Sequence, residues 1–293
     1  MDFLTPVTAK IQPLVSMPQI EPPSQNGSWV SEETYWEVYY DHPEANYEWN
    51  NGYLEEKPVS SNTTYLMYKW LLMLLHCYME AHPLAKMAGL EMGFRLRLPN
   101  RKVKIRKPHL GVVLNSNPVP LLPDDPRYDG IFDLCVEALS TTTRQAIERD
   151  TIHKKQDYAQ GGVGEYYILS AGKYASLFYR LNQWGMYEPI TPVAGNVIQS
   201  QVLPGFQFRL ADLYRQPGLK ELAQDELYRG FVLPSYYAQI QRADEAEKKA
   251  VKAEKRADKA EKRADDAERK AQEALKRAEL LAAKLRELGI AVN

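Results

Sequence analysis

This 293-residue chain has few cysteines and no long apolar run, and each shortage excludes a class of protein. Cys77 and Cys135 both lie in apolar stretches and offer neither a disulfide framework nor a zinc-binding spacing, which favours a reducing compartment. The N-terminal residues lack the basic start and apolar core of a secretory signal. The longest apolar run, at 70–79, is too short to cross a bilayer. We therefore expect a cytoplasmic protein without membrane association.

The charges of the chain are almost balanced, with a formal net charge of −1, so their distribution matters more than their sum. Residues 95–107 contain only basic charges. Within this stretch Lys102, Lys104 and Arg106 alternate with apolar residues, which places them on one face of a strand. Such a strip could bind DNA through its phosphates. An edge strand whose charges discourage aggregation of sheets is an equally good interpretation.

The sequence pattern predicts three regions. Residues 1–29 are rich in proline and form a flexible arm. Residues 30–237 mix helix and strand patterns, with a hairpin turn at Asn51-Gly52. We expect a helix from about 60 to 81, strands near 89–98, 102–114, 131–139, 165–169, 174–181, 186–190 and 197–209, and a helix at 142–160. This order predicts an α/β fold in which a mixed sheet is flanked by helices.

The third region, residues 238–293, contains an alanine-rich heptad pattern at 242–288. With Ala243 at position a, alanine fills most a and d positions, glutamate recurs at e, and lysine or arginine recurs at g. In a parallel pair each g cation meets an e glutamate of the partner. The pattern therefore predicts a helix about 70 Å long that forms a homodimer through a parallel coiled coil. Because alanine buries only a methyl group, a single unpaired helix is the alternative.

The candidate site combines an imidazole, a carboxylate and an ammonium near the ends of apolar strands. His109 lies where one strand pattern begins, and Glu137 lies near the end of another. Lys154 follows in the next helix, four residues after Asp150. Carboxylates with a lysine suit phosphodiester hydrolysis, because carboxylate oxygens bind Mg²⁺ and the ammonium supports the attacking water. Alternatively, Glu137 and Lys154 form only a buried ion pair, and His109 is a histidine at the core edge.

Several segments resemble those of a known family. They are Glu44-x-x-Tyr47-Glu48-x-x-x-Gly52, Arg106-Lys107-Pro108, Val136-Glu137-Ala138-Leu139-Ser140, Asp150…Lys154…Tyr158, Gly162-Val163-Gly164-Glu165-Tyr166-Tyr167 and Leu203-Pro204-Gly205-Phe206. The arrangement resembles the Uma-type restriction endonucleases of the PD-(D/E)XK nuclease superfamily, over roughly residues 30–215. The resemblance implies a restriction-endonuclease-like domain that hydrolyses DNA with Mg²⁺ or Mn²⁺.

The resemblance also implies roles for individual residues. Glu137 would be a metal ligand, Lys154 the catalytic lysine, and Glu48 an accessory acid that completes the metal site. Position 109 would be the first metal-binding aspartate, but this chain has His109. A neutral imidazole is softer than a carboxylate and carries no charge, so Mg²⁺ disfavours it, whereas Mn²⁺ tolerates it better. We therefore expect impaired cleavage, or a catalytically inactive nuclease fold that binds DNA or protein and self-associates.

Overall fold

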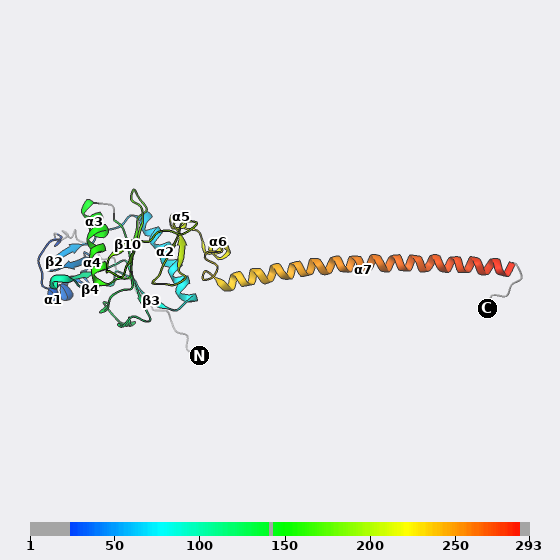
Figure 1. Ribbon diagram of the computed structural model, residues 1–293, viewed down its shortest axis with the longest axis horizontal. Coiled ribbons are helices and arrows are strands. Elements are labelled where there is room, and N and C mark those ends of the chain that lie inside the picture. The colour runs from blue at the N-terminus through cyan, green and yellow to red at the C-terminus, as the bar shows by residue number, and fades with distance from the viewer. Residues whose placement is uncertain (1–23, 141–142, 288–293) are drawn as a thin grey trace, which may run out of the picture. The chain divides into compact units, whose positions relative to one another are not determined.

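A computed structural model describes residues 24–140 and 143–287, and the chain divides into two compact units, Met1–Gln216 and Pro217–Asn293 (Figure 1). Most of the predicted N-terminal arm, residues 1–23, lies outside the described residues. The rest of it pairs with the hairpin that follows: Gly27 N–H donates to Leu54 O at 2.8 Å. Within the described ranges no helix is both long and apolar enough to cross a membrane.

The first sheet of the larger unit is antiparallel and has the strand order β2-β1-β5-β4. Its strands are β1 (Tyr47–Asn50), β2 (Tyr53–Glu56), β4 (Phe94–Arg97) and β5 (Val103–Arg106). The predicted turn joins β1 to β2, with Asn51 at φ 49° and Gly52 at φ 109°. A Cβ on Gly52 would lie 2.6 Å from the indole nitrogen of Trp29, so glycine is required there for space as well as conformation. Two short helical segments precede this sheet: the α-helix α1 (Glu32–Thr34) and the π-helix η1 (Tyr35–Tyr39).

The second sheet has six strands in the order β10-β9-β8-β7-β6-β3. Its strands are β3 (Ala85–Ala88), β6 (Leu110–Leu114), β7 (Leu134–Ala138), β8 (Glu165–Leu169), β9 (Leu177–Leu181) and β10 (Tyr187–Pro189). β7 and β8 pair in parallel, and the other neighbours in this sheet pair antiparallel. The helical connection between β7 and β8 comprises α3 (Arg144–Glu148), η3 (Arg149–His153) and α4 (Lys154–Gly161). The predicted mixed α/β fold is confirmed.

Helices lie against the second sheet. α2 (Asn62–Ala81) corresponds to the helix predicted from about 60 to 81. Ser61 Oγ caps it by accepting the N–H of Thr64 at 3.2 Å, and the helix contacts β7 and β8. Side chains alternate along β7, so Cys135 and Glu137 face the helix α4, while Leu134 and Val136 lie on the opposite face. A hairpin of β11 (Val197–Gln199) and β12 (Gln207–Arg209) is followed by α5 (Leu210–Arg215).

The predicted strand at 102–114 is two strands in two different sheets. β5 ends at Arg106, and β6 starts at Leu110 in the second sheet. Pro108 lies in the short link and cannot donate a hydrogen bond to a ladder, which suits it to a break between strands. The link therefore places Arg106 and His109 where the two sheets meet.

The smaller unit contains α6 (Leu219–Gln224) and α7 (Pro234–Glu287), a continuous helix of 54 residues (Figure 1). The predicted C-terminal helix is confirmed and starts four residues before the predicted boundary. Its pairing with a partner stays a prediction.

Candidate active site

The structure brings Glu137 and Lys154 together in the protein interior. The Nζ of Lys154 lies 2.7 Å from Glu137 Oε1, and Tyr158 donates its hydroxyl to the same oxygen at 3.2 Å. All three side chains are completely buried. Burial disfavours the Glu137 carboxylate, but Lys154 and the other nearby cations outweigh it and hold its pKa well below the usual range. Glu137 is therefore ionised and neutralised by the ammonium of Lys154.

Lys154 contacts three carboxylates rather than one. Its Nζ lies 2.9 Å from Glu48 Oε1 and 3.5 Å from Asp150 Oδ1, in addition to the contact with Glu137. Burial would lower the pKa of Lys154, but the charges of Glu137 and Glu48 raise it above its ordinary value. The ammonium thus occupies the position between the acids where a bound cation would otherwise compensate them.

Glu48 on β1, like Glu137, has polar partners at both of its carboxylate oxygens. Its Oε2 lies 3.0 Å from the NH1 group of Arg106, and its Oε1 accepts the backbone N–H of Lys107 at 2.9 Å. Burial opposes its ionisation, yet Lys154 and Arg106 lower the pKa of Glu48 to about 2. The predicted accessory acid is therefore close to Lys154, and it reaches Glu137 through the ammonium that both of them contact.

The predicted cationic strip on β5 is largely not available to DNA. Arg106 is completely buried and binds Glu48, Glu55 and Asp157, the last at 2.7 Å. Lys104 binds Asp157 at 2.9 Å and retains little exposure, so Lys102 is the exposed member of the three. The edge-strand interpretation is wrong, because β5 lies between β1 and β4. Lys104 and Arg106 share a face as predicted, but this face packs against acidic residues instead of solvent, whereas Lys102 precedes β5.

His109 is bound to Glu137 directly. Its Nδ1 lies 2.6 Å from Glu137 Oε2, and because an ionised carboxylate can only accept, this contact requires the proton on Nδ1. The backbone N–H of Ala138 also points at Nδ1, at the longer distance of 3.3 Å, and competes with this arrangement. The other ring nitrogen, Nε2, is 3.5 Å from Oε1 of Glu91, which pairs with Lys57 at 2.9 Å. The side chain of His109 is 20 % exposed, whereas that of Glu137 is 0 % exposed. His109 therefore lies between the buried acid and solvent.

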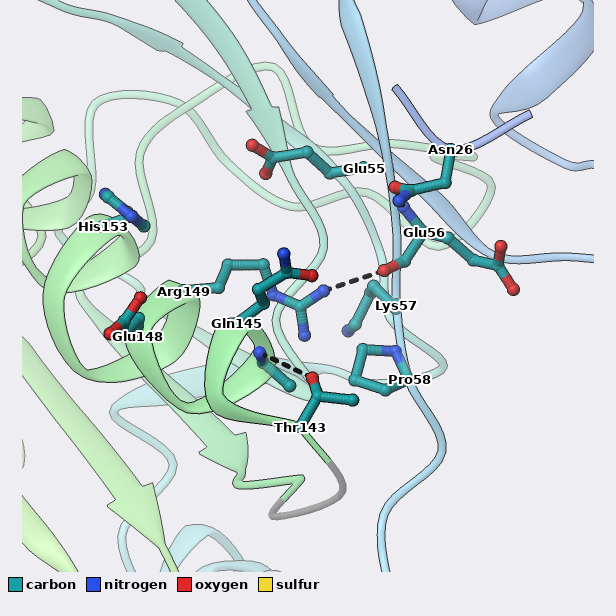
Figure 2. Close-up of a pocket in the computed structure, with 11 residues that line it drawn as sticks. Asn26, Glu55, Glu56, Lys57, Pro58, Thr143, Gln145, Glu148, Arg149 and His153 are labelled. Atoms are coloured by element: carbon teal, nitrogen blue, oxygen red, sulfur yellow. Dashed lines mark hydrogen bonds between the residues drawn. The ribbon is translucent and has the colours of Figure 1, made fainter. Parts of the chain in front are cut away.

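Two cavities border this network, and neither is lined by Glu137 or Lys154. The first, of about 440 Å³, is lined by residues of β2, α3 and η3. Arg149, one of these residues, extends from its helix towards β2 and donates to Glu56 O at 2.9 Å (Figure 2). The second, of about 640 Å³, includes His109 and Glu91 in its lining. Lys57 lines both. Solvent thus reaches the outer members of the network while the central ion pair stays closed.

These residues do not fit a divalent-metal centre as they are arranged. Both oxygens of Glu137 already have partners, and the ammonium of Lys154 separates Glu137 from Glu48. Among the residues that the structure describes, no group of three or more His, Cys, Asp and Glu side chains could hold a metal ion. His109 and Glu137 could serve as ligands only if the hydrogen bond between them were broken.

Several partners in the network are absent from the sequence prediction. Glu91 and Asp157 contribute acids, while Arg149 and Lys57 contribute cations. Asp157 lies three residues after Lys154 on the same helix, a spacing that could have indicated it. Glu91 had no such signal, because it reaches the site from a turn in which both Leu90 and Glu91 have positive φ.

Comparison with known proteins identifies the family. Residues 32–211 match the Uma2 family, described as "Putative restriction endonuclease"; this is more than half of the chain, which therefore belongs to that family. A search of solved structures finds a putative nuclease belonging to DUF820 from Anabaena variabilis ATCC 29413, with 12% sequence identity and a TM-score of 0.49. The match covers 64% of this chain and 98% of that chain. No curated protein matches this chain.

Proposed function

We propose that this chain is a DNA endonuclease of its family whose metal-dependent hydrolysis is impaired by His109. The observation that carries the proposal is the 2.6 Å contact between His109 Nδ1 and Glu137 Oε2. In a two-acid site that carboxylate oxygen would bind a metal ion beside the carboxylate at position 109. Here the imidazole takes up the oxygen and brings no negative charge, so the affinity for Mg²⁺ is reduced.

The charged groups around Glu137 are those that the proposal requires. Lys154 supplies a buried ammonium next to Glu137, which would orient water and stabilise charge developing on a phosphate once the closed ion pair opened. Glu48 is the second acid within reach of that ammonium. What the pocket lacks is the hard anionic ligand at position 109, and Mn²⁺, which tolerates nitrogen ligands better than Mg²⁺, is the ion on which residual activity would depend.

The test is conversion of supercoiled plasmid to nicked and linear forms in Mg²⁺ and in Mn²⁺. We expect little cleavage by the natural chain in Mg²⁺ and a gain with His109→Asp, which restores the missing carboxylate. The gain should disappear in His109→Asp/Lys154→Ala. His76→Asp, which adds the same charge at an exposed position of α2, is the matched control and should behave like the natural chain.

Calorimetric titration of each chain with Mg²⁺ separates metal binding from cleavage. Binding by His109→Asp but not by the natural chain or by His76→Asp would support the proposal. Efficient cleavage by the natural chain in Mg²⁺, surviving Lys154→Ala, would show that a different set of residues performs the reaction.

A second candidate function is a catalytically inactive module that binds DNA or protein. The observation in its favour is the complete burial of Glu137 and Lys154, which lie outside both neighbouring cavities. The same assay distinguishes the two functions. If His109→Asp binds Mg²⁺ and still leaves plasmid intact, the binding module is the better description.

A further inference from the structure

The long helix α7 carries charged side chains that its own neighbours do not neutralise. In the heptad that begins at Ala243, position e is glutamate in four successive heptads, and position g is lysine or arginine in the same four. Residues at both positions are exposed along the helix. Among its described residues, the structure records one ion pair within α7, between Arg269 and Asp266 at 3.0 Å, and neither residue is at e or g.

The e glutamates have no cation among their neighbours within the helix. Side chains meet on a helix at separations of three and four residues. Glu261 has Asp258 and Asp265 at two of these positions and alanines at the other two. Glu254 likewise has Asp258 on one side and no cation on the other. A single helix stabilised by its own ion pairs would place lysine or arginine at these positions.

Among the g cations, Arg256 shows the converse pattern, whereas Lys249, Arg263 and Lys270 each have an acidic neighbour three or four residues away. Arg256 has Lys252 and Lys259 at separations of four and three residues, and alanines at its remaining neighbouring positions. Like charges at these separations destabilise an isolated helix. By contrast, the aspartates at b are followed four residues later by cations at f, as in Asp258 and Lys262. The back of the helix is thus arranged to neutralise itself, whereas the e glutamates and Arg256 have no opposite charge beside them in their own helix.

We infer that α7 binds α7 of a second copy of this chain, in parallel, through the a/d seam and its two charged flanks. In a parallel pair each g residue faces the e′ residue five positions further along the partner, so Arg256 meets Glu261 and Arg263 meets Glu268. The exposed apolar side chain of Leu281, at position d, is covered by the same contact. The partner thereby supplies the cations that the e glutamates lack within their own helix.

Antiparallel pairing does not satisfy these charges in any register. It would set e against e′ and g against g′, and position e is acidic and position g basic in every heptad from 243 to 270. Sliding one helix along the other by whole heptads changes nothing, because the pattern repeats. The second copy must therefore run in the same direction, and the two copies of the preceding unit, Met1–Gln216, are attached at the same end of the helix pair.

Single cysteines in the full-length chain test both the partner and the direction. Native Cys77 and Cys135 are buried, so they contribute little background. Ala250→Cys and Ala278→Cys each place a thiol at position a, on either side of the middle of the heptad region. In a parallel pair each variant alone should form a disulfide-linked dimer under mild oxidation. Lys255→Cys, at the outward f position, is the matched control and should remain monomeric on a denaturing gel.

Other results would overturn the inference in distinguishable ways. If the two alanine variants crosslink only when mixed, the pair is antiparallel. If neither alanine variant crosslinks and light scattering gives the mass of one chain, α7 is a single helix. If the alanine variants crosslink only as much as Lys255→Cys does, the disulfides come from random collisions between chains. A complex with a different protein, and none with a second copy, would also contradict it.

Charge exchange provides a second test that does not depend on cysteine. Arg256→Glu/Arg263→Glu should weaken self-association at least tenfold, while the helix content measured by circular dichroism should not fall, because the new glutamate at 256 lies beside Lys252 and Lys259. Adding Glu261→Lys/Glu268→Lys should restore association. If the variant with all four substitutions does not regain self-association, the pairing of g with e′ is refuted. None of these results depends on whether the chain cleaves DNA.

Discussion

Replacement of Lys154 by methionine is the most direct test of how the buried network is built. The substitution keeps the length and apolar stem of the side chain but removes the ammonium that contacts Glu137 at 2.7 Å and Glu48 at 2.9 Å. Glu48 would keep Arg106 as a partner at 3.0 Å. Glu137 would keep only its hydrogen bonds from His109 and Tyr158, and it would become the poorly compensated buried charge.

The expected cost follows from this loss of compensation. Removing one partner of a buried ion pair typically destabilises a protein by about 3–5 kcal/mol. In a unit of this size each kcal/mol lowers the melting temperature by about 2–4 °C, so Lys154→Met should lower it by about 10 °C or somewhat more. The same charge change at Lys102→Met, an exposed site just before β5, should leave it within about 2 °C.

Thermal unfolding followed by circular dichroism measures the effect, and a double variant tests its cause. If the uncompensated charge of Glu137 is responsible, then Lys154→Met/Glu137→Gln should be more stable than Lys154→Met alone, because the second substitution removes that charge. A melting temperature for Lys154→Met within about 2 °C of the natural chain would refute the reasoning. So would a double variant that is less stable than either single variant.

Three further outcomes can be measured on the same protein. Because the folded-state pKa of Glu48, about 2, is below its ordinary value of 4.5, its contribution to stability should be complete above pH 4.5 and lost as the pH falls towards 2, which acid unfolding followed by fluorescence should show. Gly111→Ala should cost about 1–3 kcal/mol in urea unfolding, since its Cβ would lie 2.4 Å from the ring of Phe132. Ser61→Ala should cost about 1 kcal/mol in the same assay through loss of the cap of α2.

Local sequence signals predicted much of the fold. The turn at Asn51-Gly52, the helix from about 60 to 81 and the strand at 165–169 all lie where expected, because each depends on residues close together in the chain. The run at 102–114 was predicted as one strand because the alternating residues at 102–106 lead towards the apolar residues at 110–114. Pro108 is compatible with a break, but the division between two sheets depends on which distant strands pair with each half, and the sequence of the run does not show which strands those are.

The candidate site divides in the same way. The sequence led us to expect Glu137 and Lys154 either in one site or as a buried ion pair, and the structure has them in contact. The burial of Arg106 could not be predicted from its neighbours in the sequence. The alternation of side chains along a strand shows which residues share a face, but not which other residues cover that face. Glu48, Glu55 and Asp157 cover that face, and they come from three separate elements.

The link at Lys107-Pro108 gives these ionic contacts a mechanical role. Arg106 anchors the first sheet to α4 through Asp157, while His109, on the other side of the link, is fastened to Glu137 of the second sheet. The residues of the proposed site, His109 and Glu137, thus also help to hold the two sheets of the larger unit together. A chain of this kind has a reason to retain its acids and its lysine even after turnover is lost, so the presence of those side chains alone is a poor guide to enzymatic competence.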